Sequence, residues 1–135
     1  MIGGYVLDPS IIGDFGCDVL HALQVIHELD MAAQAIVIPT TAMAEALTHL
    51  HTPEQVEQAL LLLDLGVAVP DDLTRDNTAS VATIHLTAKG DTTLGVAHAA
   101  LAARTRTARV ITCAADTWAA AHPDIEVTAI EAPPA

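Results

Sequence analysis

The chain has 135 residues, of which 52% are hydrophobic, and it carries 17 acidic residues against 5 lysines and arginines, a formal net charge of −12. This charge repels a polyanion unless a metal ion intervenes, and with 2% aromatic residues there are few side chains on which bases could stack, so a simple nucleic-acid-binding module is disfavoured. The length predicts a single domain over residues 1–131, followed by a short proline-containing tail over 132–135.

Five short apolar runs predict the strands of an α/β chain, because they lack polar alternation and helix-like stretches separate them. The runs are Gly4–Leu7, Ala35–Ile38, Val67–Val69, Arg109–Thr112 and Ile125–Ala129. We expect a central, mostly parallel sheet of four to five strands with helices on both faces, in the element order βαβααβααβαβ.

Helical spacing of apolar residues and capping signals predict the intervening helices. Thr52 and Pro53 give the sharpest start signal, with an N-cap threonine and a proline at the first helical position. The expected helices run from about Cys17 to Ala33, Thr40 to Leu50, Thr52 to Leu65, Leu73 to Ala88 and Thr92 or Thr93 to Thr105.

The two cysteines, Cys17 and Cys113, are too few and too far apart for a zinc signature or a disulfide framework, and we interpret them as buried apolar residues. No apolar run approaches the roughly 18 residues that a membrane span needs. The first residues also lack the basic region of a secretory signal. We therefore expect a cytoplasmic protein that does not enter the membrane.

Four acidic residues stand at the ends of predicted strands or at the starts of helices that follow strands: Asp8, Glu45, Asp91 and Asp116. In open α/β sheets, ligands collect outside the carboxyl ends of the strands, so these side chains are candidates to meet in space. A set of carboxylates is a site for a hard cation such as Mg²⁺ or Mn²⁺. Each acid also has a structural alternative as a helix cap, a turn residue or a partner of a helix dipole.

Three further features carry less information about function. Arg104, Arg106 and Arg109 form the one basic cluster, which we interpret as cations near a helix C-terminus. His98 lies on an alanine-rich helix and is interpreted as a packing residue rather than a phosphate ligand. The run Leu60–Leu65 is more apolar than one buried stripe requires, which predicts either core packing or a subunit interface.

Together these features resemble the PIN domain, named for the PilT N-terminus, a fold of metal-dependent nucleases that includes the VapC-type toxins of bacterial toxin–antitoxin pairs. The matching segments are Val6 to Ser10 with the first acid, Pro39 to Glu45 with the second, the alanine-rich helix Leu94 to Ala103, and the strand Arg109 to Thr112. The resemblance covers nearly the whole chain and implies a three-layer fold.

The resemblance implies a metal-dependent endoribonuclease. Asp8 would be the central ligand of Mg²⁺ or Mn²⁺, and Glu45, Asp91 and Asp116 would be direct or water-mediated ligands. Ser10 and Thr112 would orient waters or phosphate oxygens. Such an ion binds the scissile phosphate and lowers the pKa of a bound water. The implied partners are an RNA substrate, an antitoxin and a second copy of the chain in a homodimer.

At two positions the sequence departs from the family pattern. The usual third aspartate falls at about Val96 or Gly95, and Asp91 lies roughly one helical turn, about 5.4 Å, earlier. The usual fourth aspartate falls at Ala114, and Asp116 comes two residues later. The alternative is a catalytically degenerate PIN-like protein that acts through protein contacts, and an unrelated small α/β binding module is a third possibility.

Overall fold

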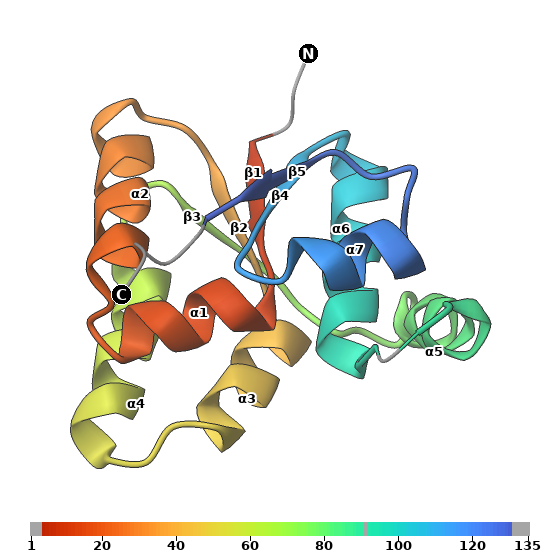
Figure 1. Ribbon diagram of the computed structural model, residues 1–135, viewed down its shortest axis with the longest axis horizontal. Coiled ribbons are helices and arrows are strands. Elements are labelled where there is room, and N and C mark those ends of the chain that lie inside the picture. Colours follow the sequence, from red (N-terminus) through yellow and green to blue (C-terminus); the bar gives the residue numbers. More distant parts are fainter. Residues whose placement is uncertain (1–3, 91, 131–135) are drawn as a thin grey trace.

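The computed structural model describes residues 4–90 and 92–130. Within these residues, five strands form one parallel sheet in the order β3-β2-β1-β4-β5, flanked by helices (Figure 1). The strands are β1 (Tyr5–Leu7), β2 (Ile36–Pro39), β3 (Ala68–Asp71), β4 (Arg109–Thr112) and β5 (Val127–Ala129). The helices are α1 (Pro9–Gly16), α2 (Leu20–Met31), α3 (Thr40–Thr48), α4 (Pro53–Leu60), the 3₁₀ turn η1 (Leu61–Asp64), α5 (Thr78–Thr87), α6 (Leu94–Arg106) and α7 (Ala115–Ala121). The predicted α/β class is confirmed.

Two hydrophobic clusters cover the two faces of the sheet, because successive strand residues point to opposite sides. Val6 and Val110 pack with the alanine-rich helix α6 and with Trp118. Leu7 and Ile111 pack with residues of α1, α2, α3 and α4 on the other face. The sheet and the helices on its two faces thus form three layers. The two clusters bury the central strands on both sides and hold the ends of β1, β2 and β4 in fixed positions.

Helix α1 is absent from the sequence-based prediction, which begins the first helix at Cys17. The start signals are present, since Asp8 is the N-cap, accepting a hydrogen bond from the backbone N–H of Ile11, and Pro9 follows at the first helical position. A glycine inside a helix costs about 1 kcal/mol, and burial of Ile11 and Phe15 offsets that cost for Gly13.

Other helix ends differ from the prediction for local reasons. Asp18 has a left-handed backbone with φ of 57°, which separates α1 from α2 and moves the start of α2 to Leu20. Helix α5 begins at Thr78, because the preceding turn is closed by hydrogen bonds between Thr74 and Asn77. The helix expected to reach Leu65 changes to a 3₁₀ turn after Leu60.

The described residues contain no helix with the length and apolar character needed to cross a membrane. The interpretation of both cysteines as buried residues is wrong for Cys17, which is exposed, while Cys113 is partly buried; both are free thiols.

Candidate functional site

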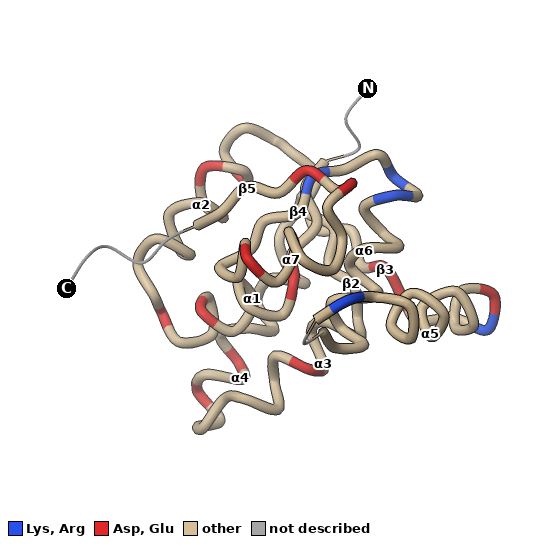
Figure 2. Tube along the Cα trace, turned by 45° about the vertical axis from the view of Figure 1, so that its right-hand side comes forward, with Lys and Arg blue, Asp and Glu red and all other residues tan. Residues whose placement is uncertain are grey.

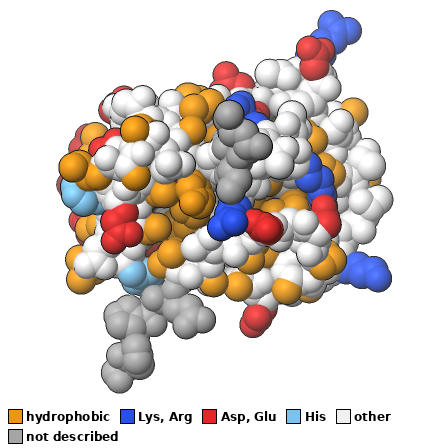
Figure 3. Space-filling model, turned by 90° about the horizontal axis from the view of Figure 1, so that it is seen from above, with side chains coloured by type: hydrophobic (Ala, Val, Ile, Leu, Met, Phe, Trp, Pro, Cys, Tyr) orange, Lys and Arg blue, Asp and Glu red, His pale blue; other side chains and the backbone are white. Residues whose placement is uncertain are grey.

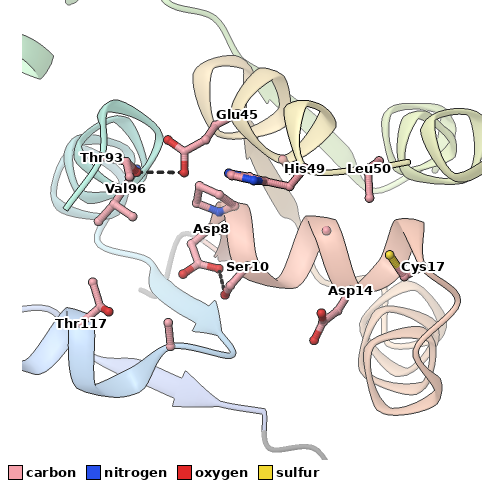
Figure 4. Close-up of a pocket in the computed structure, with 14 residues that line it drawn as sticks. Asp8, Ser10, Asp14, Cys17, Glu45, His49, Leu50, Thr93, Val96 and Thr117 are labelled. Atoms are coloured by element: carbon pink, nitrogen blue, oxygen red, sulfur yellow. Dashed lines mark hydrogen bonds between the residues drawn. The ribbon is translucent and has the colours of Figure 1, made fainter. Parts of the chain in front are cut away.

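A pocket of about 440 Å³ lies at the carboxyl ends of β1 and β4 (Figure 4). The chain runs outward from β1 through β2 to β3 and then crosses back to β4, so the strand order reverses between β1 and β4. In open α/β sheets, ligands usually bind at the carboxyl ends of the strands where the order reverses. We call this cavity the strand-end pocket. It is lined by Asp8, Pro9, Ser10, Gly13, Asp14, Cys17, Glu45, Ala46, His49, Leu50, Thr93, Val96, Ala114 and Thr117.

Asp8 lies at the bottom of the strand-end pocket and is only 1% exposed. Four groups in the described part of the chain donate hydrogen bonds to its carboxylate. Oδ1 accepts from the Ser10 hydroxyl at 2.6 Å and from the Ile11 N–H at 3.2 Å. Oδ2 accepts from the Thr112 hydroxyl at 2.6 Å and from Trp118 Nε1 at 2.8 Å. A carboxylate offers about four acceptor positions, so those of Asp8 are all in use.

Burial raises the pKa of Asp8 above its usual value of 3.8, and the four hydrogen bonds oppose that rise without cancelling it. The carboxyl group is therefore surrounded by four hydrogen-bond donors, and apolar residues pack around them. Ser10 and Thr112, which the sequence analysis gives as supporting residues, both donate to this carboxylate.

Glu45 extends from α3 toward the N-terminus of α6. Its Oε2 accepts from the Thr93 hydroxyl at 2.9 Å, and its Oε1 accepts from the Gly95 N–H at 3.1 Å. A carboxylate in this position satisfies a free backbone N–H and interacts favourably with the helix dipole. Glu45 thus stabilises the start of α6, and about two of its four acceptor positions stay open toward the strand-end pocket.

Of the other two predicted acids, only Asp116 lies in the part of the chain that the structure describes, and it does not line the strand-end pocket. Asp116 is exposed on the first turn of α7 and lines a separate depression beside Ala129. Asp91 lies outside the described residues. The positions that the family pattern gives to its third and fourth acids do reach the pocket, but Val96 and Ala114 occupy them.

Among the described residues, three of the four expected acids do not form a Mg²⁺ or Mn²⁺ centre, and the fourth, Asp91, lies outside those residues. Such ions require several oxygen ligands in near-octahedral geometry, and Asp8 has no open acceptor position. Within residues 4–90 and 92–130, the acids Asp8, Glu45 and Asp116 do not form a group of three whose ligand atoms lie within 4.8 Å of one another. Besides the buried Asp8, the strand-end pocket therefore presents two partly exposed carboxylates among the described residues, Asp14 of α1 and Glu45 of α3.

The basic cluster is engaged in salt bridges. Arg104 pairs with Asp124 at 3.0 Å, Arg106 with Asp71 at 3.2 Å, and Arg109 with Glu126 at 2.8 Å. Figure 2 shows acidic residues distributed over most elements. On the face shown in Figure 3, blue and red side chains lie next to each other and do not form a continuous basic patch. These arginines are thus neutralised locally and offer little attraction to a phosphate backbone.

His98 packs as the sequence analysis expects. It is fully buried on α6, and its Nε2 lies 3.2 Å from Asp71 Oδ1, which also places it away from the lining of the strand-end pocket.

Trp118, which donates the fourth hydrogen bond to Asp8, was not predicted as a site residue from the sequence. The sequence contains one indication of this contact. Trp118 is the single tryptophan of the chain, and a buried indole N–H needs an acceptor. The acceptor itself lies 110 positions earlier, and no local pattern links the two residues.

The sequence matches no protein-family model, and no curated protein matches it.

Proposed function

We propose that this chain is a PIN-like protein without nuclease activity, which acts by binding a positively charged segment of a partner protein at the strand-end pocket. The observation that carries the proposal is the pair Val96 and Ala114, two apolar residues that line the pocket where the PIN pattern has acids. A ribonuclease of that class depends on clustered carboxylates to hold its ions.

The state of Asp8 supports the absence of catalysis. A metal ion would need an acceptor position that Ser10, Ile11, Thr112 and Trp118 now use. The indole N–H of Trp118 donates only and cannot turn to accept, so displacing it would leave a buried donor unpaired at a cost of about 1–3 kcal/mol.

Charge supports a basic protein segment as the occupant. The net charge of −12 attracts a cationic partner and raises its rate of association, whereas it repels RNA. Glu45 and Asp14 are both partly exposed in the strand-end pocket and can accept hydrogen bonds from a Lys or Arg side chain. The two free thiols fit a reducing compartment, so we place this function in the cytoplasm.

Fluorescence anisotropy with a labelled oligo-arginine peptide tests the proposal. Glu45→Gln should weaken binding by about tenfold, since a charge-assisted hydrogen bond to a desolvated group contributes about 1.5–3 kcal/mol. Glu57→Gln, which removes one exposed charge from α4, is the matched control and should change binding little. Equal affinities for both variants would show that the peptide responds only to net charge, and the proposal would then fail.

Metal-dependent cleavage of RNA is the second candidate, favoured by one observation: Asp8 and Glu45 line the same pocket at the carboxyl edge of the sheet. Mn²⁺ titration during thermal unfolding tests it. A bound ion should raise the midpoint by mass action, and Asp8→Asn should abolish the rise. No response at millimolar Mn²⁺, together with intact RNA, would reject this candidate.

We also propose that the chain pairs with a second copy through the junction of α4 and η1, where Leu60 and Leu61 are 38% and 51% exposed. Exposed leucines of this kind mark contact surfaces when they are contiguous. Leu61→Glu should shift the mass measured by sedimentation equilibrium from dimer to monomer. A wild-type monomer at micromolar concentration would contradict the pairing.

An antitoxin would be the partner in a toxin-like context, and a gene for a small DNA-binding protein directly upstream would support that role.

A further inference from the structure

Three residues with different ligand atoms meet beside the strand-end pocket. Asp14 comes from α1, His21 from the first turn of α2, and Cys113 from the segment that follows β4. One ligand atom from each residue can be chosen so that all three lie within 4.8 Å of one another. In Figure 4, Asp14 extends from α1 on the side away from Glu45, so this group is separate from the carboxylate that binds the N-terminus of α6.

The separations suit a small tetrahedral ion. Cys113 Sγ lies 3.1 Å from Asp14 Oδ2, and His21 Nε2 lies 3.8 Å from the same oxygen. Bonds of about 2.0–2.3 Å at tetrahedral angles place neighbouring ligand atoms about 3.3–3.8 Å apart. Both of these separations are therefore close to that range.

The chemistry of the donors selects the ion. A thiolate, an imidazole nitrogen and a carboxylate oxygen together favour a borderline-soft ion such as Zn²⁺, whereas Mg²⁺ and Mn²⁺ favour oxygen ligands. We propose that Asp14, His21 and Cys113 bind one Zn²⁺ ion, with water in the fourth position. The Cys113 thiol releases its proton to solvent when the Zn–S bond forms.

The local hydrogen bonding leaves room for such an ion. The Cys113 S–H donates to Asp14, which is a weak interaction that a bound ion can replace. The strand-end pocket, which Asp14 lines, provides a path from solvent. The ion would join α1, α2 and the end of β4, three elements far apart in sequence.

Cobalt is the probe that tests the site, because a thiolate bound to Co²⁺ gives a charge-transfer absorption band in the near ultraviolet. The reduced protein should develop this band with one equivalent of Co²⁺ and lose it when Zn²⁺ is added. Cys113→Ser should lose the band. Cys17→Ser is the matched control, since it removes the other thiol of the chain, and it should keep the band.

Thermal unfolding gives a second readout that does not depend on the thiolate band. Zn²⁺ should raise the midpoint of the wild type, and His21→Gln should weaken the affinity by at least about tenfold. Glu45→Gln should keep both responses, so failure of this site and failure of peptide binding are distinguishable. A wild type without a cobalt band at excess Co²⁺, or a band that Cys17→Ser abolishes and Cys113→Ser keeps, would overturn the assignment.

Discussion

Trp118 Nε1 donates a hydrogen bond of 2.8 Å to Asp8 Oδ2, and this contact joins helix α7 to the end of strand β1. Both residues are buried, at 0% and 1% exposure. The contact occupies an acceptor position of Asp8 that a metal ion would need. It also holds α7 against the sheet. The same interaction therefore contributes both to the packing of α7 and to the hydrogen bonding of Asp8 in the candidate site.

Trp118→Phe keeps a large aromatic ring but removes this donor. We expect it to lower the free energy of unfolding by about 1–3 kcal/mol, because a buried carboxylate oxygen loses a partner and part of the indole volume is lost. Urea denaturation measures the change. The same substitution in an Asp8→Asn background should cost less, and a double-mutant cycle that gives no coupling would contradict the role assigned to this hydrogen bond.

The raised pKa of Asp8 predicts a specific dependence of stability on pH. A carboxyl group with a higher pKa in the folded state binds more protons when folded, so its contribution to stability falls as pH rises from the unfolded value of 3.8 to the folded value. Above the folded pKa the contribution is constant.

Unfolding free energies of the wild type and of Asp8→Asn, measured over the acidic range, test this dependence. The difference between the two proteins should change by up to about 1.4 kcal/mol per pH unit inside the window, with the wild type losing stability as pH rises. A difference of the opposite sign would show that the hydrogen bonds outweigh burial.

The fold was predictable because its signals are local. Short unbroken apolar runs identify all five described strands, and Thr52 with Gln55 three residues later gives a capping box that the structure contains. Helix α1 was missed because Gly13 and Gly16 weaken its local pattern. Its stability comes from tertiary burial of residues such as Ile12, which a pattern over a few residues does not record.

The candidate site was predictable only in part. Asp8 and Glu45 were expected to lie close together because strand ends in a parallel sheet converge, and both line the strand-end pocket. The partners of Asp8 were harder to identify, since Thr112 and Trp118 lie more than 100 positions away and contact it only after folding. Asp116 does not line the pocket, because its place in the first turn of α7 exposes its side chain to solvent. The position of an acid along a helix does not by itself give the direction of its side chain.

Gly95 is required for the close packing of α6 against Glu45 and α1. A Cβ atom there would lie 2.8 Å from Pro9 Cγ, 2.8 Å from Glu45 Oε1 and 3.1 Å from Ala42 Cα. Gly95→Ala should therefore destabilise the protein by about 1–3 kcal/mol through overpacking.

Gly13→Ala is the matched control for Gly95→Ala, because it is also a glycine in a helix but has no atom within 4 Å of the added Cβ. It should stabilise the protein by up to about 1 kcal/mol through helix propensity. Chemical denaturation of both variants checks the contrast. Equal effects would mean that packing at the N-terminus of α6 is looser than the contacts indicate.

Val96→Asp combined with Ala114→Asp should create a hard-cation site. Both positions line the strand-end pocket with Glu45, and the added carboxylates repel one another until a cation neutralises them. We expect the double variant to unfold at a lower temperature than the wild type without metal, and to be stabilised by about 2.7 kcal/mol when Mn²⁺ reaches 100 times its dissociation constant.

Thermal unfolding with and without Mn²⁺ measures this gain, in a Cys113→Ser background so that the Asp14, His21 and Cys113 group does not contribute. Adding Glu45→Gln to the double variant should reduce the response, since that carboxylate is the accessible native ligand. A Mn²⁺ response in the unmodified pocket as large as in the double variant would contradict a degenerate site. It would mean that a carboxylate oxygen of Asp8 exchanges one of its hydrogen-bond donors for a metal ion. Ribonuclease activity would then be the function to test.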